Sequence, residues 1–322
     1  MKPIYLLFAA ATLALASCAR SGQQEGAALK YVQDIISGQD AAAHAIVSAY
    51  SGPARDGAVY VAGPYAPVLG AMKNLIRFEA FDNVTGQPVP DALPDFAGEK
   101  ICALYDFCPA PEDREEMRAA TVRAVVEAMD GVCFVSPYDN EGLDTRPVAK
   151  ALLLPSPNAA WGMPDVDSLL TAFGIKLPVI CPLKSVLEPF FKGRRGSASV
   201  AVLTTQEYAS GEAYKGYIDF LAAKQGLDSV ACTVSADSSV TAVLTHPVDL
   251  LIIDNPALDS RQISENVKPI PVVDLARKGA EECYRALRRG NLFTHRVAWP
   301  EAMEYMSAEG KILQYNTKYL EK

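Results

Sequence analysis

Short apolar runs recur along this chain of 322 residues, and most are followed by a segment with the pattern of a helix. The runs that predict strands span residues 58–62, 101–105, 132–135, 151–154, 178–181, 199–203, 230–234, 250–253 and 270–273. Continuously apolar strands separated by helices are typical of parallel sheets that helices cover on both faces. These nine strands are more than the smallest doubly wound domain contains. We therefore predict an α/β fold with two doubly wound parallel-sheet (αβα) domains that face each other across a cleft.

The order of these patterns predicts the domain boundaries. We expect a first α/β domain over residues 52–155, completed by residues 272–322, and a second α/β domain over residues 156–271. Residues 18–51 should form a polar tether and an N-terminal helix. The end of the chain, residues 290–322, either folds back across the domains or forms a surface for a partner. The main helices are expected at residues 27–50, 67–81, 111–129, 165–173, 210–225 and 276–289, with another ending near 191.

Charge and cysteine content exclude several classes of function. A net charge of −8 argues against nucleic-acid binding as the main task. The cysteines have no CxxC pairing, so we expect no zinc site and interpret most of them as buried apolar residues. In an oxidising compartment a disulfide is also compatible with the sequence, for example Cys102–Cys108. The chain has no GxGxxG, phosphate-binding loop or HExxH motif, and no cofactor is expected.

The first residues have the pattern of a secretion signal. One lysine, an apolar run over residues 4–15 and small residues before Cys18 predict a signal peptide over residues 1–17. The sequence Leu15-Ala16-Ser17-Cys18 resembles the lipobox of bacterial lipoproteins. The resemblance implies a diacylglyceryl thioether on Cys18 and cleavage just before it.

The lipid predicts a location outside the cytoplasm. Each buried CH₂ group contributes about 0.8 kcal/mol, so several acyl chains hold a protein on a membrane. We therefore expect the membrane as a partner through Cys18. Ala19 follows the cysteine in place of the aspartate of an inner-membrane retention signal, which favours the outer membrane facing the periplasm.

Small polar residues follow several predicted strands. The carboxyl ends of parallel strands meet at one edge of a sheet, where ligands bind. We therefore predict a small-molecule site there. Its candidate residues are Ser136, Tyr138, Ser156, Asn158, Thr204, Thr205, Ser210, Asp254 and Asn255. These residue types also cap helices and form turns, so both roles stay open.

The region from residue 151 to about 221 resembles the aspartate/glutamate racemase family. The motifs that carry the resemblance are Leu153-Leu154-Pro155-Ser156-Pro157-Asn158, Leu177-Pro178-Val179-Ile180, Val202-Leu203-Thr204-Thr205, Ser210-Gly211-Glu212-Ala213-Tyr214, and later Asp249-Leu250-Leu251-Ile252-Ile253-Asp254-Asn255 and Pro271-Val272-Val273-Asp274. The resemblance implies two facing domains with a small cleft that binds an amino acid. It covers roughly half of the chain and is weak before residue 150.

The positions that carry the chemistry of this family differ here. Two cysteines exchange the α-proton in these racemases, because each must pass a proton to or from carbon. Ser156 or Pro157 occupies the first position, and Asp254 the second. His246 lies near the second position, but beside Pro247 we interpret it as a turn residue. We therefore expect a racemase-like lipoprotein that lacks racemase activity and binds an amino acid or a carboxylate.

Two other classes of protein remain as alternatives. Residues 130–139, 200–204 and 210–225 also resemble parts of type I periplasmic solute-binding proteins, which implies a sugar or nucleoside ligand. Three or more chain crossings between the domains, and a groove ringed by aromatic residues, favour that class. The aromatic candidates are Tyr65, Tyr138, Trp161 and Tyr208.

The second alternative is a hydrolase or isomerase. It would use the carboxylates of Asp106, Asp139 and Asp254, which follow predicted strands. Two carboxylates converging within about 5–10 Å in one deep pocket favour this class.

Overall fold

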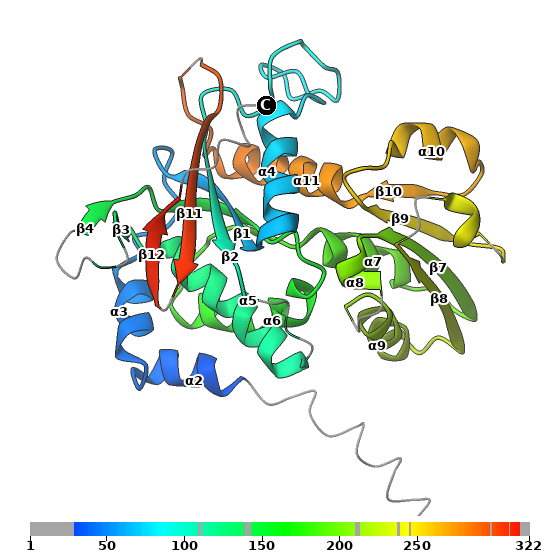
Figure 1. Ribbon diagram of the computed structural model, residues 1–322, viewed down its shortest axis with the longest axis horizontal. Helices are drawn as coiled ribbons and strands as arrows, with labels where there is room; N and C mark the ends of the chain where they lie inside the picture. Colours follow the sequence, from blue (N-terminus) through cyan, green and yellow to red (C-terminus); the bar gives the residue numbers. More distant parts are fainter. Residues whose placement is uncertain are drawn as a thin grey trace, which may run out of the picture.

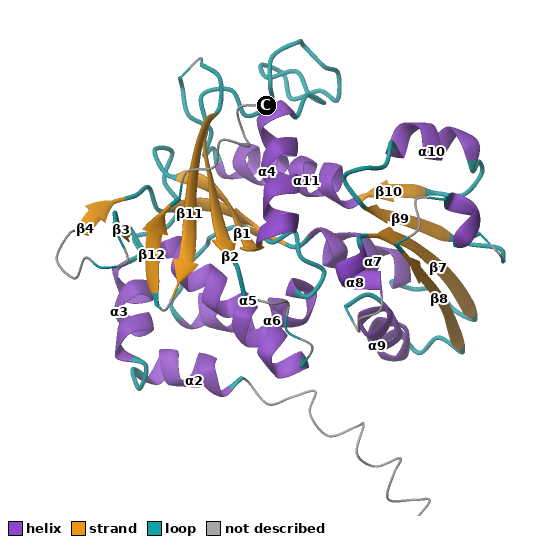
Figure 2. Cartoon of the chain, in the orientation of Figure 1, coloured by secondary structure: helices purple, strands orange, loops and turns teal. Residues whose placement is uncertain are grey.

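The computed structural model describes residues 29–108, 111, 113–136, 138, 143–209, 213–236, 239–244, 246–296, 298–308 and 310–315. Two β-sheets form the centres of two lobes (Figure 1). Helices lie on both faces of each sheet, so the α/β fold with two layered lobes is as predicted (Figure 2). Within the described residues, no helix is long and apolar enough to cross a membrane.

The larger sheet has the strand order β4-β3-β12-β11-β2-β1-β5-β6. Its strands are β1 (Ala58–Pro64), β2 (Lys100–Asp106), β3 (Val132–Phe134), β4 (Leu143–Thr145), β5 (Ala149–Leu153), β6 (Val179–Ile180), β11 (Glu301–Ala308) and β12 (Lys311–Gln314). The sheet is mixed, in contrast to the parallel sheet predicted, because β12 is antiparallel to β11 and β4 is antiparallel to β3.

The smaller sheet is fully parallel, with the order β10-β9-β7-β8. Its strands are β7 (Ser197–Thr204), β8 (Ser229–Ser235), β9 (Leu250–Asp254) and β10 (Val272–Asp274). The predicted boundary between the domains is residue 155, whereas this sheet begins at Ser197. Residues 179–180 form β6 at the edge of the larger sheet, because they pair with β5.

Alternating side chains divide the core of the larger lobe into two layers. Val59 and Val61 of β1 pack with α4 (Tyr65–Arg77) and α11 (Leu275–Gly290), whereas Tyr60 and Ala62 pack with α5 (Arg114–Met129) and α6 (Ala159–Ala172). This two-residue period is that of a strand buried on both faces. The remaining helices are α2 (Lys30–Ser37), α3 (Ala41–Ala49), α7 (Pro182–Phe191), α8 (Gln206–Ala209), α9 (Lys215–Gln225) and α10 (Ser260–Asn266).

The predicted helix over residues 27–50 is broken into α2 and α3. Gly38 ends α2 with a φ of 78°, a left-handed conformation that favours glycine. The Asp40 side chain then caps α3 by accepting a hydrogen bond from the Ala43 amide. Helix α2 is held to the larger lobe by Asp165, which accepts from the Leu29 amide and forms an ion pair with Arg118.

The C-terminal segment folds back into the larger sheet, which is one of the two arrangements that the sequence left open. Strand β11 runs parallel to β2 over residues 301–307, and β12 joins β11 to β3 (Figure 1). The loop before β11 is held by a fully buried ion pair between Lys150 and Glu99. Lys150 also donates to the Leu292 carbonyl over 3.0 Å, and Glu99 accepts from the Thr294 amide over 2.7 Å.

The six cysteines after residue 100 are free thiols. Cys102 is buried in β2 and Cys108 is exposed, so the Cys102–Cys108 disulfide considered from the sequence is not formed. Cys133, Cys181 and Cys283 are also buried, as predicted for apolar packing, and Cys232 is partly exposed.

Candidate ligand-binding cleft between the two sheets

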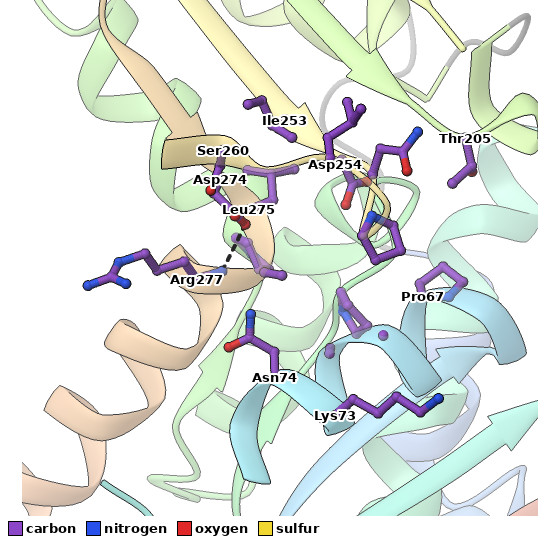
Figure 3. Close-up of a pocket in the computed structure, with 18 of the residues that line it drawn as sticks. Pro67, Lys73, Asn74, Thr205, Ile253, Asp254, Ser260, Asp274, Leu275 and Arg277 are labelled. Carbon is purple, nitrogen blue, oxygen red and sulfur yellow. Dashed lines mark hydrogen bonds between the residues drawn. The ribbon is translucent and has the colours of Figure 1, made fainter. Parts of the chain in front are cut away.

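A cleft of about 640 Å³ lies between the lobes. One wall is helix α4 of the larger lobe. The facing wall consists of the carboxyl ends of β7, β9 and β10 and the first residues of α10 and α11 (Figure 3). Ligands of parallel sheets bind at this end of the strands, and the volume is typical of small-molecule sites. The cleft is therefore the main candidate for a binding site.

Asp254 is the last residue of β9 and lines the cleft. The Tyr214 hydroxyl donates a hydrogen bond to Asp254 Oδ2, and Thr204 Oγ1 donates to the Tyr214 hydroxyl over 3.4 Å. Burial raises the pKa of the Asp254 carboxyl to about 6; the Tyr214 hydrogen bond opposes this rise, and the charge of Asp274 adds to it. A carboxyl group with a perturbed pKa in a cleft is typical of a functional site.

Helix α4 supplies polar side chains on the opposite wall. Lys73 is exposed and Asn74 is partly buried, and both lie across the cleft from Asp254 (Figure 3). The spacing of Gly70, Lys73, Asn74 and Arg77 places these residues on neighbouring turns of one helix face. The cleft therefore has an acidic group on the strand side and cationic and amide groups on the helix side.

Both signs of charge line the cleft. The basic residues are Lys73, Arg77, Arg261 and Arg277, and the acidic residues are Glu79, Asp254 and Asp274. Asp274 caps α11, because its Oδ1 accepts from the Arg277 amide over 3.0 Å (Figure 3). The Arg277 side chain forms an ion pair with Glu281 at 3.3 Å. Asp254 on the strand side and Lys73 on the helix side thus give the cleft charged groups of opposite sign on its two walls.

Three of the residues predicted from strand ends line this cleft: Thr205, Asp254 and Asn255. The Asn255 amide is used in its own turn, because Nδ2 donates to the Thr204 carbonyl and Oδ1 accepts from the Ala257 amide. Thr204 is fully buried behind the cleft. The Asn255 side chain therefore has the turn role, which is one of the two roles that the sequence left open.

The loop after β5 separates this cleft from a second pocket. Leu153 and Pro155 line the cleft, whereas Leu154, Ser156 and Asn158 line the second pocket. Ser156 Oγ lies 3.4 Å from the hydroxyl of Tyr208, which lines the cleft. The predicted residues Ser156 and Asn158 are therefore close to the cleft but do not line it.

Two predicted residues lie away from both pockets. Ser136 Oγ accepts from the Tyr138 amide in a turn, and Tyr138 is 92% exposed. They follow β3, which the strands β12 and β11 separate from β2. The predicted convergence of all strand ends on one opening is therefore wrong for Ser136. Ser210, Asp139 and Cys18 lie outside the described residues.

The carboxylates proposed for the hydrolase or isomerase alternative do not share one pocket. Asp254 lines the cleft, and Asp106 lines the second pocket. His246 and the described cysteines are absent from the cleft lining, and no group of three or more potential metal-ligating side chains occurs within the described part of the chain.

The features expected of a type I solute-binding protein are not found among the described residues. The chain passes between the sheets twice, after β6 and after β10. Of the four aromatic candidates, Tyr208 lines the cleft. Tyr65 instead stacks on Phe107, and Trp161 packs against Tyr217.

Among known proteins, this chain is similar to solved structures. No protein-family model and no curated protein matches the chain. A glutamate racemase from Francisella tularensis in complex with D-glutamate is 14% identical, with 79% of this chain and 89% of that chain covered and a TM-score of 0.46. A glutamate racemase isoform from Bacillus anthracis is 15% identical, with 79% and 90% covered and a TM-score of 0.47. An arylmalonate decarboxylase is 15% identical, with 72% and 91% covered and a TM-score of 0.40. At these scores, neither an activity nor a family membership follows.

Replacing Asp254 by asparagine should stabilise the protein at neutral pH. The folded-state pKa of about 6 exceeds the ordinary value of 3.8, so between these values the folded state binds more protons than the unfolded state. Stability from this group is therefore lost as the pH rises from 4 to 6. We expect D254N to raise the free energy of unfolding by about 1–2 kcal/mol at pH 7.5, less than the full shift because the cleft is open to water.

Urea denaturation of both proteins at pH 4 and pH 7.5 measures this difference. The asparagine carbonyl still accepts from Tyr214, so the two proteins should be nearly equal at pH 4. If D254N and the wild type differed in stability by the same amount at pH 4 and at pH 7.5, this would contradict a carboxylate at Asp254 that burial destabilises.

Proposed function

We propose that this chain is a membrane-anchored lipoprotein that binds a small amino acid or carboxylate in the cleft between its two sheets, without carbon-acid catalysis. The observation that carries the binding proposal is the pairing of Asp254 on one wall with Lys73 and Asn74 on the other. An amino acid presents an ammonium group and a carboxylate, and these two groups are complementary to the two walls.

The energetic state of Asp254 supports this orientation of the ligand. A carboxylate withdrawn from water is unfavourable unless it is paired, and the Tyr214 hydroxyl donates a hydrogen bond to the Asp254 carboxylate. A ligand ammonium group at Asp254 adds the missing positive charge. Lys73 is exposed on the helix wall, so its long, flexible side chain pairs with a ligand carboxylate at little cost in desolvation.

The absence of a cysteine from the described lining of the cleft supports the non-catalytic part of the proposal. No described cysteine lines the cleft, and burial raises the pKa of the Cys102, Cys181 and Cys283 thiols. Ser156, one candidate for the first catalytic position, is buried beside Tyr208. A serine at this position lacks the low pKa that an exchangeable acid or base on carbon needs.

A thermal-shift screen of the full-length protein in detergent tests the binding proposal. The panel contains L- and D-amino acids, dicarboxylates, sugars and nucleosides. A ligand at 100 times its dissociation constant adds about 2.7 kcal/mol, which corresponds to about 4–5 °C for a protein of this size. We expect shifts with amino acids or carboxylates. Shifts confined to sugars or nucleosides would instead support the solute-binding alternative.

Catalysis is tested on the ligands that give a shift. Incubation in D₂O with the protein should leave the α-hydrogen signal of an amino acid unchanged in NMR spectra. Loss of that signal, faster than in a sample without protein, would show proton exchange at carbon and contradict the non-catalytic proposal.

Membrane attachment rests on the sequence, because residues 1–28 lie outside the described part. We expect the wild-type chain, expressed in a bacterial host, to sediment with membranes and to carry acyl chains on Cys18 by mass spectrometry. C18S should move to the soluble fraction, whereas C108S, which changes an exposed cysteine, should stay with membranes. Membrane sedimentation of C18S to the wild-type extent would contradict the lipid anchor.

A further inference from the structure

A second pocket, of about 420 Å³, lies inside the larger lobe. It is bounded by the carboxyl ends of β1, β2 and β11, the loop after β5, and one face of helix α5. It shares no lining residue with the cleft. Its volume is also within the range of sites for small ligands.

The walls of this pocket are apolar. Helix α5 contributes Met117, Ala120 and Ala124 at the spacing of one helix face. Leu104 and Leu154 form the opposite side, and both are almost fully buried. Such walls suit a short hydrocarbon chain. Exposed Cys108 and Gly310 also line the pocket, which places its mouth beside them.

A carboxyl group from the same helix face lines the pocket. Glu127 Oε1 accepts a hydrogen bond from Ser307 Oγ over 2.7 Å. Burial raises the pKa of Glu127, the Ser307 hydrogen bond and the charges of Arg123 and Arg146 oppose the rise, and Asp106 adds to it. Asp106, at the end of β2, lines the same pocket.

An unused acceptor lines the same pocket near the start of α5. Asn158 is 7% exposed, and its Nδ2 donates to the Pro111 carbonyl over 3.3 Å. Among the described residues, its Oδ1 has no hydrogen-bond partner. A buried carbonyl oxygen without a donor costs about 1–3 kcal/mol, so a donor supplied by a ligand is favourable here.

The positive charges near the pocket do not neutralise both carboxylates. Arg123 forms an exposed ion pair with Glu116 at 3.2 Å. Arg146 is buried and directs its guanidinium to the Val132 and Glu127 carbonyls and the Tyr60 hydroxyl. With Asp106, Glu127 and Glu116 against Arg123 and Arg146, the surroundings carry one excess negative charge.

We propose that this pocket is a second ligand site, specific for a small aliphatic amine whose ammonium group binds beside Glu127 and Asp106. The hydrocarbon chain lies along the apolar face of α5. The acceptor-rich end selects a cation with several N–H donors over a neutral alcohol of the same shape.

Isothermal titration of the full-length protein with n-butylamine, 1,4-diaminobutane, 1-butanol and butyrate tests this proposal. We expect dissociation constants between about 10 μM and 1 mM for at least one amine, and binding at least ten times weaker for the alcohol and for butyrate. Equal affinity for the amine and the alcohol, or no amine binding, would overturn the proposal.

A matched pair of variants locates the site. E127Q keeps an acceptor for Ser307 but removes the charge, and we expect at least tenfold weaker amine binding. E115Q changes an exposed glutamate of the same helix that neither lines the pocket nor enters this charge balance, and binding should be unchanged. Equal amine affinity of E127Q and the wild type would place the amine elsewhere.

Alkylation of Cys108 gives a readout that does not depend on a variant. Cys108 is exposed and lines the pocket, so a bound amine should slow its reaction with iodoacetamide, followed by mass spectrometry of its peptide. No protection at a saturating amine concentration would contradict binding at this pocket. Because Glu127 and Cys108 line this pocket and not the cleft, the E127Q comparison and the alkylation of Cys108 let this proposal and the proposed function fail separately.

Discussion

Replacing Lys150 by methionine should lower the free energy of unfolding by about 3–5 kcal/mol. Lys150 and Glu99 are each 0% exposed and form an ion pair. Removal of the ammonium group leaves the Glu99 carboxylate buried without its counter-charge. It also leaves the Arg55 and Leu292 carbonyls without the Lys150 donor. Urea denaturation followed by circular dichroism measures the loss.

A double variant separates the charge effect from a loss of packing. E99Q/K150M removes both charges, and we expect it to regain at least half of the stability that K150M loses. The exposed pair of Lys215 and Asp219 provides the control, because K215M should change stability by less than about 1 kcal/mol. A K150M effect as small as that of K215M would contradict the buried pair.

Replacing Gly98 by alanine should cost about 2–4 kcal/mol. Gly98 has a φ of 76°, and a Cβ atom there would lie 2.0 Å from the Arg296 carbonyl oxygen. Its amide also donates to the Ala298 carbonyl over 2.6 Å. The new methyl group therefore has to separate β2 from the segment that leads into β11.

Gly174→Ala provides the matched control for this prediction. Gly174 has a similar φ of 66° but open space around the site of a new Cβ atom. Its replacement should cost only the left-handed backbone conformation, about 1 kcal/mol. Equal losses for the two variants, measured by thermal denaturation, would contradict the close approach of the C-terminal segment to Gly98.

Sequence periodicity was sufficient for the strands that are continuously apolar. All nine predicted strands overlap observed strands, from β1 at Ala58–Pro64 to β10 at Val272–Asp274. Strands β4, β11 and β12 were missed. The sequence of β11, Glu-Ala-Met-Glu-Tyr-Met-Ser-Ala, has polar residues within it, because only part of the strand is buried. Its position is fixed by long-range pairing with β2, which local pattern does not encode.

The missed strands also explain the wrong placement of Ser136. The prediction that β3 contributes to the same opening as the other strands assumed that β3 lies near β2. The strands β11 and β12 lie between them. The separation of Ser156 from the cleft has a different origin, because residues 153–156 alternate between the two pockets with the two-residue period of an extended chain.

The residues on the helix wall of the cleft could not be predicted from the sequence. Asp254 was predicted because it ends a strand, and strand ends converge in parallel sheets. Lys73 and Asn74 lie inside α4, where only the packing of the two lobes determines which face borders the cleft. Asp274 directly follows the strand predicted over residues 270–273, but the sequence assigns its motif to the family resemblance and not to the site.

The most direct test of a charged ligand in the cleft is isothermal titration of wild-type and D254N protein, full-length in detergent, with an amino acid from the screen. The structure predicts binding at least ten times weaker for D254N, together with its higher stability at neutral pH, and unchanged binding for D167N, an exposed aspartate on α6. Equal affinity of D254N and the wild type would contradict recognition of the ligand at Asp254.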